Sequence, residues 1–312
     1  MILGSSIGED AALIALNRTV LVLKTDPVTG TSADIGWWAV HINANDVASR
    51  GARPRWFLCD LLLPDGTSPA AVDRIMSQVG KAARQVGAAV VGGHTEVTPT
   101  LRRPIIVGYM VGLVSRRGYV TSSGARAGDR VIMTKTAGIE GTAVLASDFA
   151  SKLHGKIPQR TLIRAQRMSR QLSVVKDATI ALRTGGVRAM HDPTEGGLLQ
   201  GLWELAEASS VGFHVHESAI PISPETERIC SILKVNPLRL LSSGCLLIAA
   251  ERQRSKKIVN SLKKNRISAS IIGAFTDRRR GRRLVRLSGK ELEIGPLERD
   301  ELYRIIEKHR PT

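Results

Sequence analysis

Apolar and polar positions in the first part of the chain alternate between strand-like and helix-like spacing. Apolar runs at residues 13–16 and 20–23 flank the turn-forming pair Asn17-Arg18 and predict the two strands of a hairpin. A third apolar run, at residues 56–63, predicts another strand. Residues 34–50 lie between these runs and predict a helix.

A second helix and two more strands follow. Apolar residues at positions 72, 75, 76, 79, 82, 83 and 86 repeat every three to four residues, which is the spacing of one helix face. Residues 88–91 predict a short strand that ends at Gly92-Gly93, and residues 105–114 predict a long strand. The first part of the chain is therefore a mixture of strands and helices.

A segment rich in Gly, Ser and Arg, residues 115–129, predicts a domain boundary. We expect one domain over residues 1–117 and a second over residues 118–312. The second domain is expected to contain strands at 130–134, 212–216, 245–250 and 268–275 and helices at 197–209, 224–233 and 253–265. The predicted fold class is α/β (α+β) with two domains.

Composition agrees with this organisation. The chain has 312 residues, of which 43% are hydrophobic and 23% charged, so it can form one large or two medium globular domains. Only 4% of the residues are aromatic, so aliphatic side chains must fill the core, as in layered packing of helices on sheets.

Cysteine usage and hydropathy predict a cytoplasmic location. The three cysteines, Cys59, Cys230 and Cys245, form no CxxC pair and no even disulfide set, which favours a reducing compartment and argues against structural zinc. The amino terminus lacks the features of a signal peptide, and no apolar run reaches the length of a membrane-spanning helix. We therefore expect no membrane partner.

The net charge of +17 raises the hypothesis of nucleic-acid binding. The densest basic run is Asp277-Arg278-Arg279-Arg280-Gly281-Arg282-Arg283, between two strand-like segments. However, the chain carries no recognition motif and few aromatic residues that could stack on bases. Nucleic acid is therefore the disfavoured partner.

Scarce carboxylates beside predicted strand and helix ends are the first candidates for chemistry. Asp10, in Gly8-Glu9-Asp10, precedes the first strand, Asp26 ends the second, and Asn45-Asp46 lies in an apolar helical stretch. Oxygen ligands of this kind suit Mg²⁺ that carries nucleotide phosphates. The alternative for Asp10 and Asp26 is a solvated turn, and for Asp46 an exposed helix face.

Three glycine-containing motifs could approach a phosphate group. In Gly92-Gly93-His94-Thr95-Glu96 the glycines would open backbone amides to an anion in a loop, although a simple tight turn is the alternative. The segment 134–142 joins a strand to a helix without the spacing of a Walker loop. The segment 191–197 opens a helix, where Asp192 or Thr194 could act only as a cap.

Taken together and in order, these motifs resemble the AIR synthetase superfamily. The resemblance spans nearly the whole chain and is nearest to HypE-like proteins, because the residues after Asp192-Pro193-Thr194-Glu195-Gly196-Gly197 continue the same pattern as far as Ile222. It is carried by Gly8-Glu9-Asp10-Ala11-Ala12, Thr25-Asp26, Asn45-Asp46-Val47-Ala48 through Gly51-Ala52-Arg53-Pro54, Gly92-Gly93-His94-Thr95 and Asp192-Pro193-Thr194-Glu195-Gly196-Gly197.

The resemblance implies an amino-terminal domain that dimerises into a shared β-barrel and a carboxy-terminal α/β sandwich. It implies ATP and Mg²⁺ as cofactors, with the metal on Asp10, Asp26 and Asp46 and with Asp46, Asp26 and Asp192 as catalytic residues. The nucleotide-binding residues that it implies are Glu9, Asn45, Gly92, Gly93, His94, Thr95, Thr134, Lys135, Gly138, Glu140 and Gly141.

The activity implied is phosphorylation of an amide, carboxylate or phosphate oxygen of a small substrate. HypE carries its reacting group on a carboxy-terminal cysteine, whereas the last cysteine here is Cys245, so we expect a separate substrate molecule. Glu9 and His94 stand where relatives often have Asp. The alternative hypothesis is a nucleotide-binding maturation partner that has lost turnover.

Overall fold

The computed structural model of the protein describes residues 1–4, 8–29, 34–297 and 299–308. The chain divides into two compact units, Met1–Tyr119 and Val120–Thr312, while the sequence predicts a boundary at 117/118. Among the described residues, no helix has both the length and the apolar character needed to cross a membrane.

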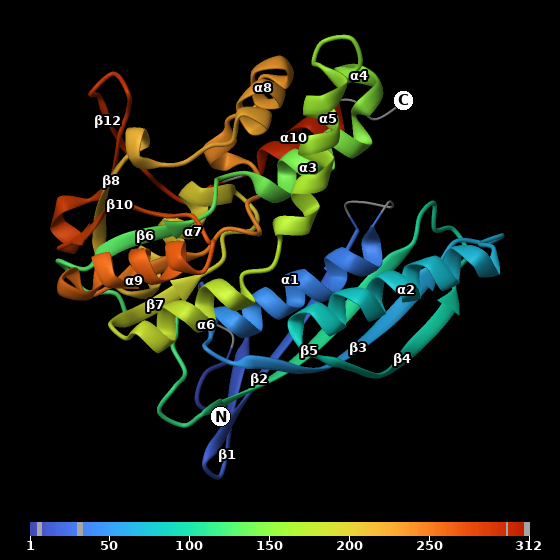
Figure 1. Ribbon diagram of the computed structural model, residues 1–312, viewed down its shortest axis with the longest axis horizontal. Helices are drawn as coiled ribbons and strands as arrows, with labels where there is room; N and C mark the ends of the chain where they lie inside the picture. The colour runs from blue at the N-terminus through green and yellow to red at the C-terminus, as the bar shows by residue number, and fades with distance from the viewer. Residues whose placement is uncertain (5–7, 30–33, 298, 309–312) are drawn as a thin grey trace. The chain divides into compact units, whose positions relative to one another are not determined.

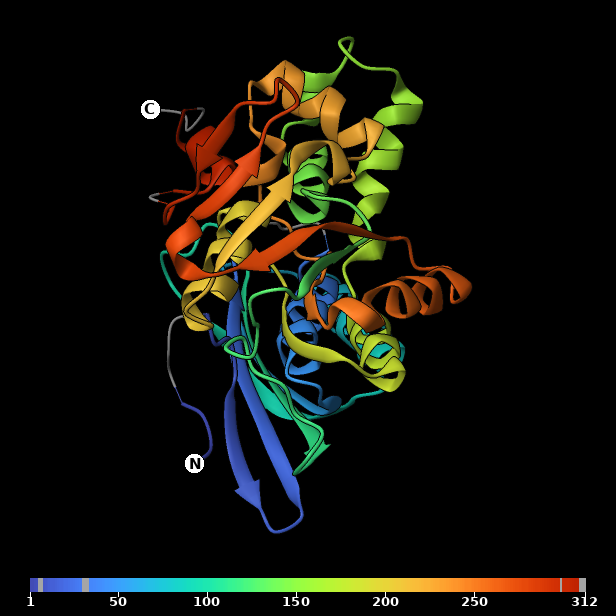
Figure 2. The same cartoon turned by 90° about the vertical axis from the view of Figure 1, so that its left-hand side faces the viewer.

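The first unit is built on one five-stranded sheet in the order β1-β2-β5-β3-β4. Neighbouring strands are antiparallel except β3 and β4, which are parallel. The predicted hairpin is confirmed, because β1 and β2 pair through a turn at Asn17-Arg18 (Figure 2, blue). The strands are β1 (Ala12–Leu16), β2 (Thr19–Val28), β3 (Arg53–Leu63), β4 (Ala89–Val97) and β5 (Ile105–Ser115).

Two helices, α1 (Ile35–Ser49) and α2 (Pro69–Val86), lie side by side over one face of this sheet (Figure 1). Helix α2 is amphipathic as predicted and begins at the cap Ser68. Helix α1 approaches β5 closely because Gly108 and Gly112 have no side chains. A Cβ at these positions would lie 2.4 Å from Asn43 Nδ2 and 2.2 Å from Val47 Cγ1.

The other face of the first sheet carries apolar side chains that remain exposed. Trp56 and Tyr109 on neighbouring strands are 41% and 37% exposed, and Leu16 on β1 is 54% exposed. Strand alternation sends Phe57, Cys59 and Met110 to the helix-covered face instead. The sheet therefore has one covered apolar face and one open apolar face within its own unit.

The prediction that Gly92-Gly93-His94-Thr95 forms a loop is wrong. These residues continue β4, which pairs with β3 as far as Val97. Gly93 has φ of 150°, and a Cβ there would lie 2.0 Å from the carbonyl oxygen of Cys59. Pairing with β3 thus extends the strand through residues whose local preference is for a turn.

The second unit contains a seven-stranded mixed sheet in the order β12-β11-β8-β10-β6-β9-β7. All neighbouring pairs are antiparallel except β11 and β8. The strands are β6 (Arg130–Thr134), β7 (Val187–His191), β8 (Gly212–His216), β9 (Leu247–Ala250), β10 (Ala269–Thr276), β11 (Arg282–Val285) and β12 (Glu291–Glu293).

Helix α7 (Gly197–Ala208) packs on one face of this sheet and forms a core with Val131 and Met133 of β6. Helices α6 (Val175–Thr184) and α9 (Arg252–Lys264) lie side by side and pack against β7, β6 and β10 (Figure 1). The remaining helices are α3 (Ile139–Asp148), α4 (Ala150–Leu153), α5 (Gln159–Gln166), α8 (Pro224–Leu233) and α10 (Glu301–Lys308). Short 3₁₀ turns are η1 (Arg167–Gln171), η2 (Glu217–Ala219), η3 (Pro237–Arg239) and η4 (Arg278–Arg280).

Candidate functional site

Asp46 lies in the last turn of α1 and is only 1% exposed, so an exposed helix face is excluded. Its carboxylate is 2.9 Å from Lys24 Nζ on β2, and the same ammonium is 3.5 Å from the carboxylate of Asp26. Lys24 and Asp26 are two residues apart on one strand, so their side chains leave the same face. The helix and the strand therefore bring these three charges together.

Burial and neighbouring charges shift the pKa values of Asp46 and Lys24. Burial raises the pKa of Asp46 to about 7, the charge of Lys24 opposes this rise, and the carboxylates of Asp10 and Asp26 add to it. Burial would lower the pKa of Lys24, but the surrounding carboxylates outweigh it and raise that pKa instead. One lysine thus faces several carboxylates, an arrangement that favours binding of a further cation.

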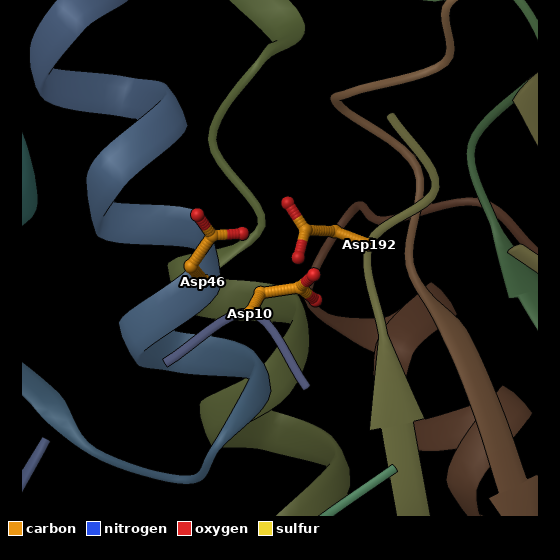
Figure 3. Close-up of side chains that lie close together, drawn as sticks. All are labelled: Asp10, Asp46 and Asp192. Carbon is orange, nitrogen blue, oxygen red and sulfur yellow. The ribbon is translucent and has the colours of Figure 1, made fainter. Parts of the chain in front are cut away.

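Asp10 joins Asp46 from the segment before β1. One carboxylate oxygen of Asp10 and one of Asp46 lie within 4.8 Å of each other, and Figure 3 shows Asp10 beside the helix that carries Asp46. Asp10, Asp26 and Asp46 are named here the acidic cluster. It contains the residue types that hold a hard divalent cation.

Arg50, directly after α1, holds the segment that carries Asp10. Its guanidinium is fully buried, pairs with the buried carboxylate of Glu9, and lies 3.6 Å from Asp10 Oδ2. Glu9 therefore faces Arg50, and its predicted nucleotide contact remains a prediction. A buried arginine with two carboxylates fixes the position of Asp10 relative to the end of α1.

Lys24 and Arg50 were missed as functional residues by the sequence analysis. A signal for both was present, because each is a cation next to or inside an apolar segment predicted to be buried. A buried cation needs a carboxylate partner, and each stands near a candidate Asp in the sequence. That signal does not identify the partner, because the segment with the cation and the segment with the carboxylate meet only in the folded unit.

Replacing Lys24 by Met is expected to lower the free energy of unfolding by about 3 kcal/mol without metal, because it leaves the buried carboxylate of Asp46 without its cation. Added Mg²⁺ should restore more stability to this variant than to the wild type. Urea unfolding with and without Mg²⁺ measures both effects, with the exposed Lys81→Met as control. Equal stability of Lys24→Met and wild type without metal would contradict the role given to Lys24.

The motif on β4 lies away from the acidic cluster within the first unit. Asp26, Gly108, Cys59 and Gly93 form one row across β2, β5, β3 and β4. Gly93 is therefore three strand spacings, roughly 14 Å, from Asp26. Asn45 is fully buried on α1 beside Asp46, whereas His94 and Thr95 are exposed on the edge strand. Their nucleotide contacts remain predictions.

The predicted phosphate loop at 134–142 packs against a neighbouring loop. The amide of Gly138 donates to Ser242 Oγ at 2.8 Å, and the amide of Gly141 donates to the carbonyl of Leu241 at 2.9 Å. Thr134 Oγ1 accepts from the amide of Leu246 at 3.0 Å. These donors and acceptors have protein partners, so the geometry gives no support to a phosphate contact through them.

Lys135 holds the interior of the second unit together. Its ammonium donates to the carbonyls of Gln171, Ser173 and Gly244 and lies 3.2 Å from Asp177. An ammonium with this many partners is poorly placed to bind phosphate as well, so its contacts argue against the predicted role. Glu140 is buried in the first turn of α3, and its role remains a prediction.

Asp192 follows β7 and is 1% exposed (Figure 3). The helix that follows, α7, begins at Gly197 with Gly196 as its N-cap residue and has no side-chain cap, so the interpretation of Asp192 or Thr194 as a helix cap is wrong. The turn between Asp192 and α7 contains two glycines in the left-handed backbone conformation, Gly196 at φ 76° and Gly197 at φ 65°. The sequence 192–197 thus forms a turn with a buried carboxylate at its start.

Asp300 is a further residue that the sequence analysis missed. It is 4% exposed, and its carboxylate accepts from the amides of Gly196 and Leu302, both at 2.6 Å. Burial raises the pKa of Asp300 from its ordinary value of 3.8 to about 6, although both amides oppose this and Glu195 adds to it. Asp300 therefore connects the segment before α10 to the turn after Asp192.

The raised pKa of Asp300 predicts that the stability of the protein depends on pH. Folding raises the pKa of Asp300, so between about pH 4 and 6 the folded chain keeps a proton on this carboxyl that the unfolded chain has lost. The stability that this protonated carboxyl contributes is fully present below about pH 4 and is lost as pH rises through 6. We expect wild type to lose about 1 kcal/mol more than Asp300→Asn between pH 5 and 7.5. Urea unfolding of both proteins measures the difference, and parallel pH profiles would contradict it.

The basic run at 277–283 does not form an unpaired strip. Arg282 pairs with Glu207 and lies 5.2 Å from the ring centroid of Trp203, while Arg283 pairs with Glu291 at 3.1 Å. Two arginines of the run are thus held by carboxylates of the same unit. This geometry adds no support to the nucleic-acid hypothesis.

Two protein-family models together match most of the chain. Residues 8–114 match the sequence model described as the N-terminal domain of AIR synthase related protein, and residues 126–286 match the C-terminal domain of the same family. A putative hydrogenase expression/formation protein of Methanocaldococcus jannaschii is 26% identical over 300 residues, which is 93% of this chain and 86% of the relative. The carbamoyl dehydratase HypE of Cupriavidus necator is 31% identical over 248 residues, 77% of this chain and 68% of the relative.

Solved structures show the same architecture. The hydrogenase maturation protein HypE in complex with ATP superposes with a TM-score of 0.78 at 26% identity, over 91% of this chain and 87% of that chain. The structure described as AaThiL complexed with AMPPCP and TMP superposes with a TM-score of 0.75 at 23% identity, over 95% and 91% of the chains, and shows likeness of fold alone. The predicted two-domain α/β fold is therefore confirmed, while the dimeric barrel remains a prediction.

Proposed function

This chain belongs to the AIR synthase related protein family, and from that premise we propose that it uses ATP to phosphorylate an amide, carboxylate or phosphate oxygen of a small substrate. Its similarity to carbamoyl dehydratase HypE and to the ATP-bound HypE structure makes it an ATP-dependent enzyme. The observation that carries the specific proposal is the pair of neighbouring carboxylates near the end of α1, the buried Asp46 and the partly buried Asp10.

The acidic cluster fits Mg²⁺. Its donor atoms are carboxylate oxygens, which Mg²⁺ prefers, and burial raises the pKa of Asp46 in a way that a bound cation would reverse. Asp10, Asp26 and Asp46 would hold the metal, and Mg²⁺ would neutralise the ATP phosphates during in-line transfer. The remaining chemistry is positioning: Lys24 holds Asp26 and Asp46, and Arg50 holds Asp10.

Asp192 is included in the proposal on the strength of the family resemblance. Its carboxylate is buried at the start of the turn 192–197, which contains two glycines in the left-handed conformation. A buried carboxylate at this position would act on the substrate. We therefore retain Asp192 as a proposed catalytic residue of the second unit.

We also propose that a second copy of the chain covers the open face of the first sheet. Ile14, Leu16, Trp56 and Tyr109 expose apolar surface there, and contiguous exposed apolar surface marks interaction sites. Analytical ultracentrifugation is expected to give a dimer for the wild type and a monomer for Trp56→Asp. A monomeric wild type would rule out this interface.

The test of the proposed function is ADP formation by the full chain with ATP and Mg²⁺ across small amides, carboxylates and phosphate monoesters. Stimulation of ADP release by one substrate class identifies the oxygen that is phosphorylated. Saturable ATP binding without ADP release on any of these substrates would instead favour the hypothesis of a nucleotide-binding partner that has lost turnover. Absence of ATP binding would overturn both.

A further inference from the structure

The second unit has a hollow of about 800 Å³ on the sheet face that carries His214 and His216. Its walls come from strands β6, β8, β10, β11 and β12 and from the turns η2 and η4, and they include Arg130 of β6 and Arg280 of η4. None of its lining residues is among those proposed for ATP or Mg²⁺. The hollow therefore needs an explanation of its own.

Strand register explains why the hollow exists. Arg130 of β6 is paired with Ala274 of β10, Ala274 with His214 of β8, and His214 with Arg283 of β11. These four residues form one row across the sheet, on the face opposite the core. Arg130 and His214 are two strand spacings, roughly 10 Å, apart. The small Ala274 between them leaves an apolar floor with basic side chains on both sides.

The charge of the hollow is positive. Three arginines line it against one carboxylate, Glu291, which already accepts from His214 Nε2 at 3.2 Å and from Arg283 at 3.1 Å. Arg130 and Arg280 make no ion pair with any residue in the described part of the chain. Two guanidinium groups are therefore available for a ligand, while Glu291 holds His214 and Arg283 in place.

We propose that this hollow binds a small molecule that carries phosphate. Guanidinium groups match phosphate oxygens in charge and geometry, and Arg130 and Arg280 offer two such groups over one floor. Ala219, Ile271 and Ala274 supply apolar surface for an organic part of the ligand. A pocket with an apolar floor and paired cations suits a compact phosphate ester better than a long polyanion, which needs an extended basic surface.

The experiment is calorimetric titration of inorganic pyrophosphate into the full chain in EDTA, so that binding through Mg²⁺ is excluded. We expect saturable binding that weakens at least about ten-fold in Arg130→Ala and in Arg280→Ala, because each removes charged hydrogen bonds. Ala274→Leu keeps every charge but fills the floor, and it should weaken binding as well. The matched control is Arg279→Ala, an exposed arginine of the same run that does not line the hollow.

Three results would overturn the proposal: no saturable binding by the wild type, equal binding by Arg130→Ala and Arg280→Ala, or equal binding by Ala274→Leu with both arginine effects present. A single-stranded oligonucleotide or an acidic peptide that binds in place of pyrophosphate would also reject a small-molecule site. The same titration with Asp46→Asn separates this inference from the proposed function, since pyrophosphate binding should persist there while ATP binding with Mg²⁺ is lost. Thermal unfolding of each variant checks that it is folded.

Discussion

Asp46→Asn is expected to weaken Mg²⁺-dependent ATP binding at least about 100-fold, because it replaces a buried carboxylate by a neutral amide at the centre of the acidic cluster. Stability should not fall with it. Burial raises the pKa of Asp46 to about 7, so the native carboxylate is costly to ionise and the amide removes that cost. Calorimetry of ATP binding with and without Mg²⁺, together with urea unfolding, measures both results.

The matched control for this variant is Asp65→Asn, which removes an exposed carboxylate of the same unit. It should leave ATP binding unchanged. If Asp46→Asn bound ATP with Mg²⁺ as tightly as the wild type, the acidic cluster would not be the metal site. If ATP bound to the wild type equally well without Mg²⁺, the metal would have no part in binding.

Arg50→Met is expected to lower the free energy of unfolding by about 3–5 kcal/mol, because it leaves the buried Glu9 carboxylate without its partner. It should also weaken Mg²⁺-dependent ATP binding, since Asp10 loses the guanidinium that holds it. Urea unfolding gives the first quantity and calorimetry the second. The exposed Arg55→Met, on β3, is the control for loss of an arginine from the same unit.

A double variant separates the two roles of Arg50. Glu9→Gln combined with Arg50→Met removes both members of the buried pair, so most of the lost stability should return. ATP binding should stay weak, because Asp10 is still not held. Full recovery of ATP binding in the double variant would show that Arg50 acts only on stability and has no positioning role.

The elements with strong local signals were predicted well. The apolar spacing of residues 72–86 is sufficient for α2, and the runs on either side of Asn17-Arg18 are sufficient for the β1–β2 hairpin. In the acidic cluster, Asp10 and Asp26 were identified as candidates from residue type and from their position at strand ends, and Asp46 as a charged residue inside an apolar helical stretch. The family resemblance, carried by short motifs, predicted the two-domain fold.

Other features depend on contacts between distant segments. The strand that contains Gly92 and Gly93 is extended by pairing with β3, against the local preference of glycine for a turn. The role of Lys135 depends on three carbonyls that lie far along the chain, and that of Asp300 on the amide of Gly196. None of these partners is marked by spacing or composition.

Helix and strand periodicity arises between neighbouring residues, and motif chemistry depends on residue type, so both can be read from the chain alone. They were enough for the α/β class, the candidate carboxylates and the family. The partner of a buried charge is different, because it depends on which segments the fold brings into contact. Lys24 between Asp26 and Asp46, and Arg50 against Glu9 and Asp10, could be identified only once β2 and α1 were packed together.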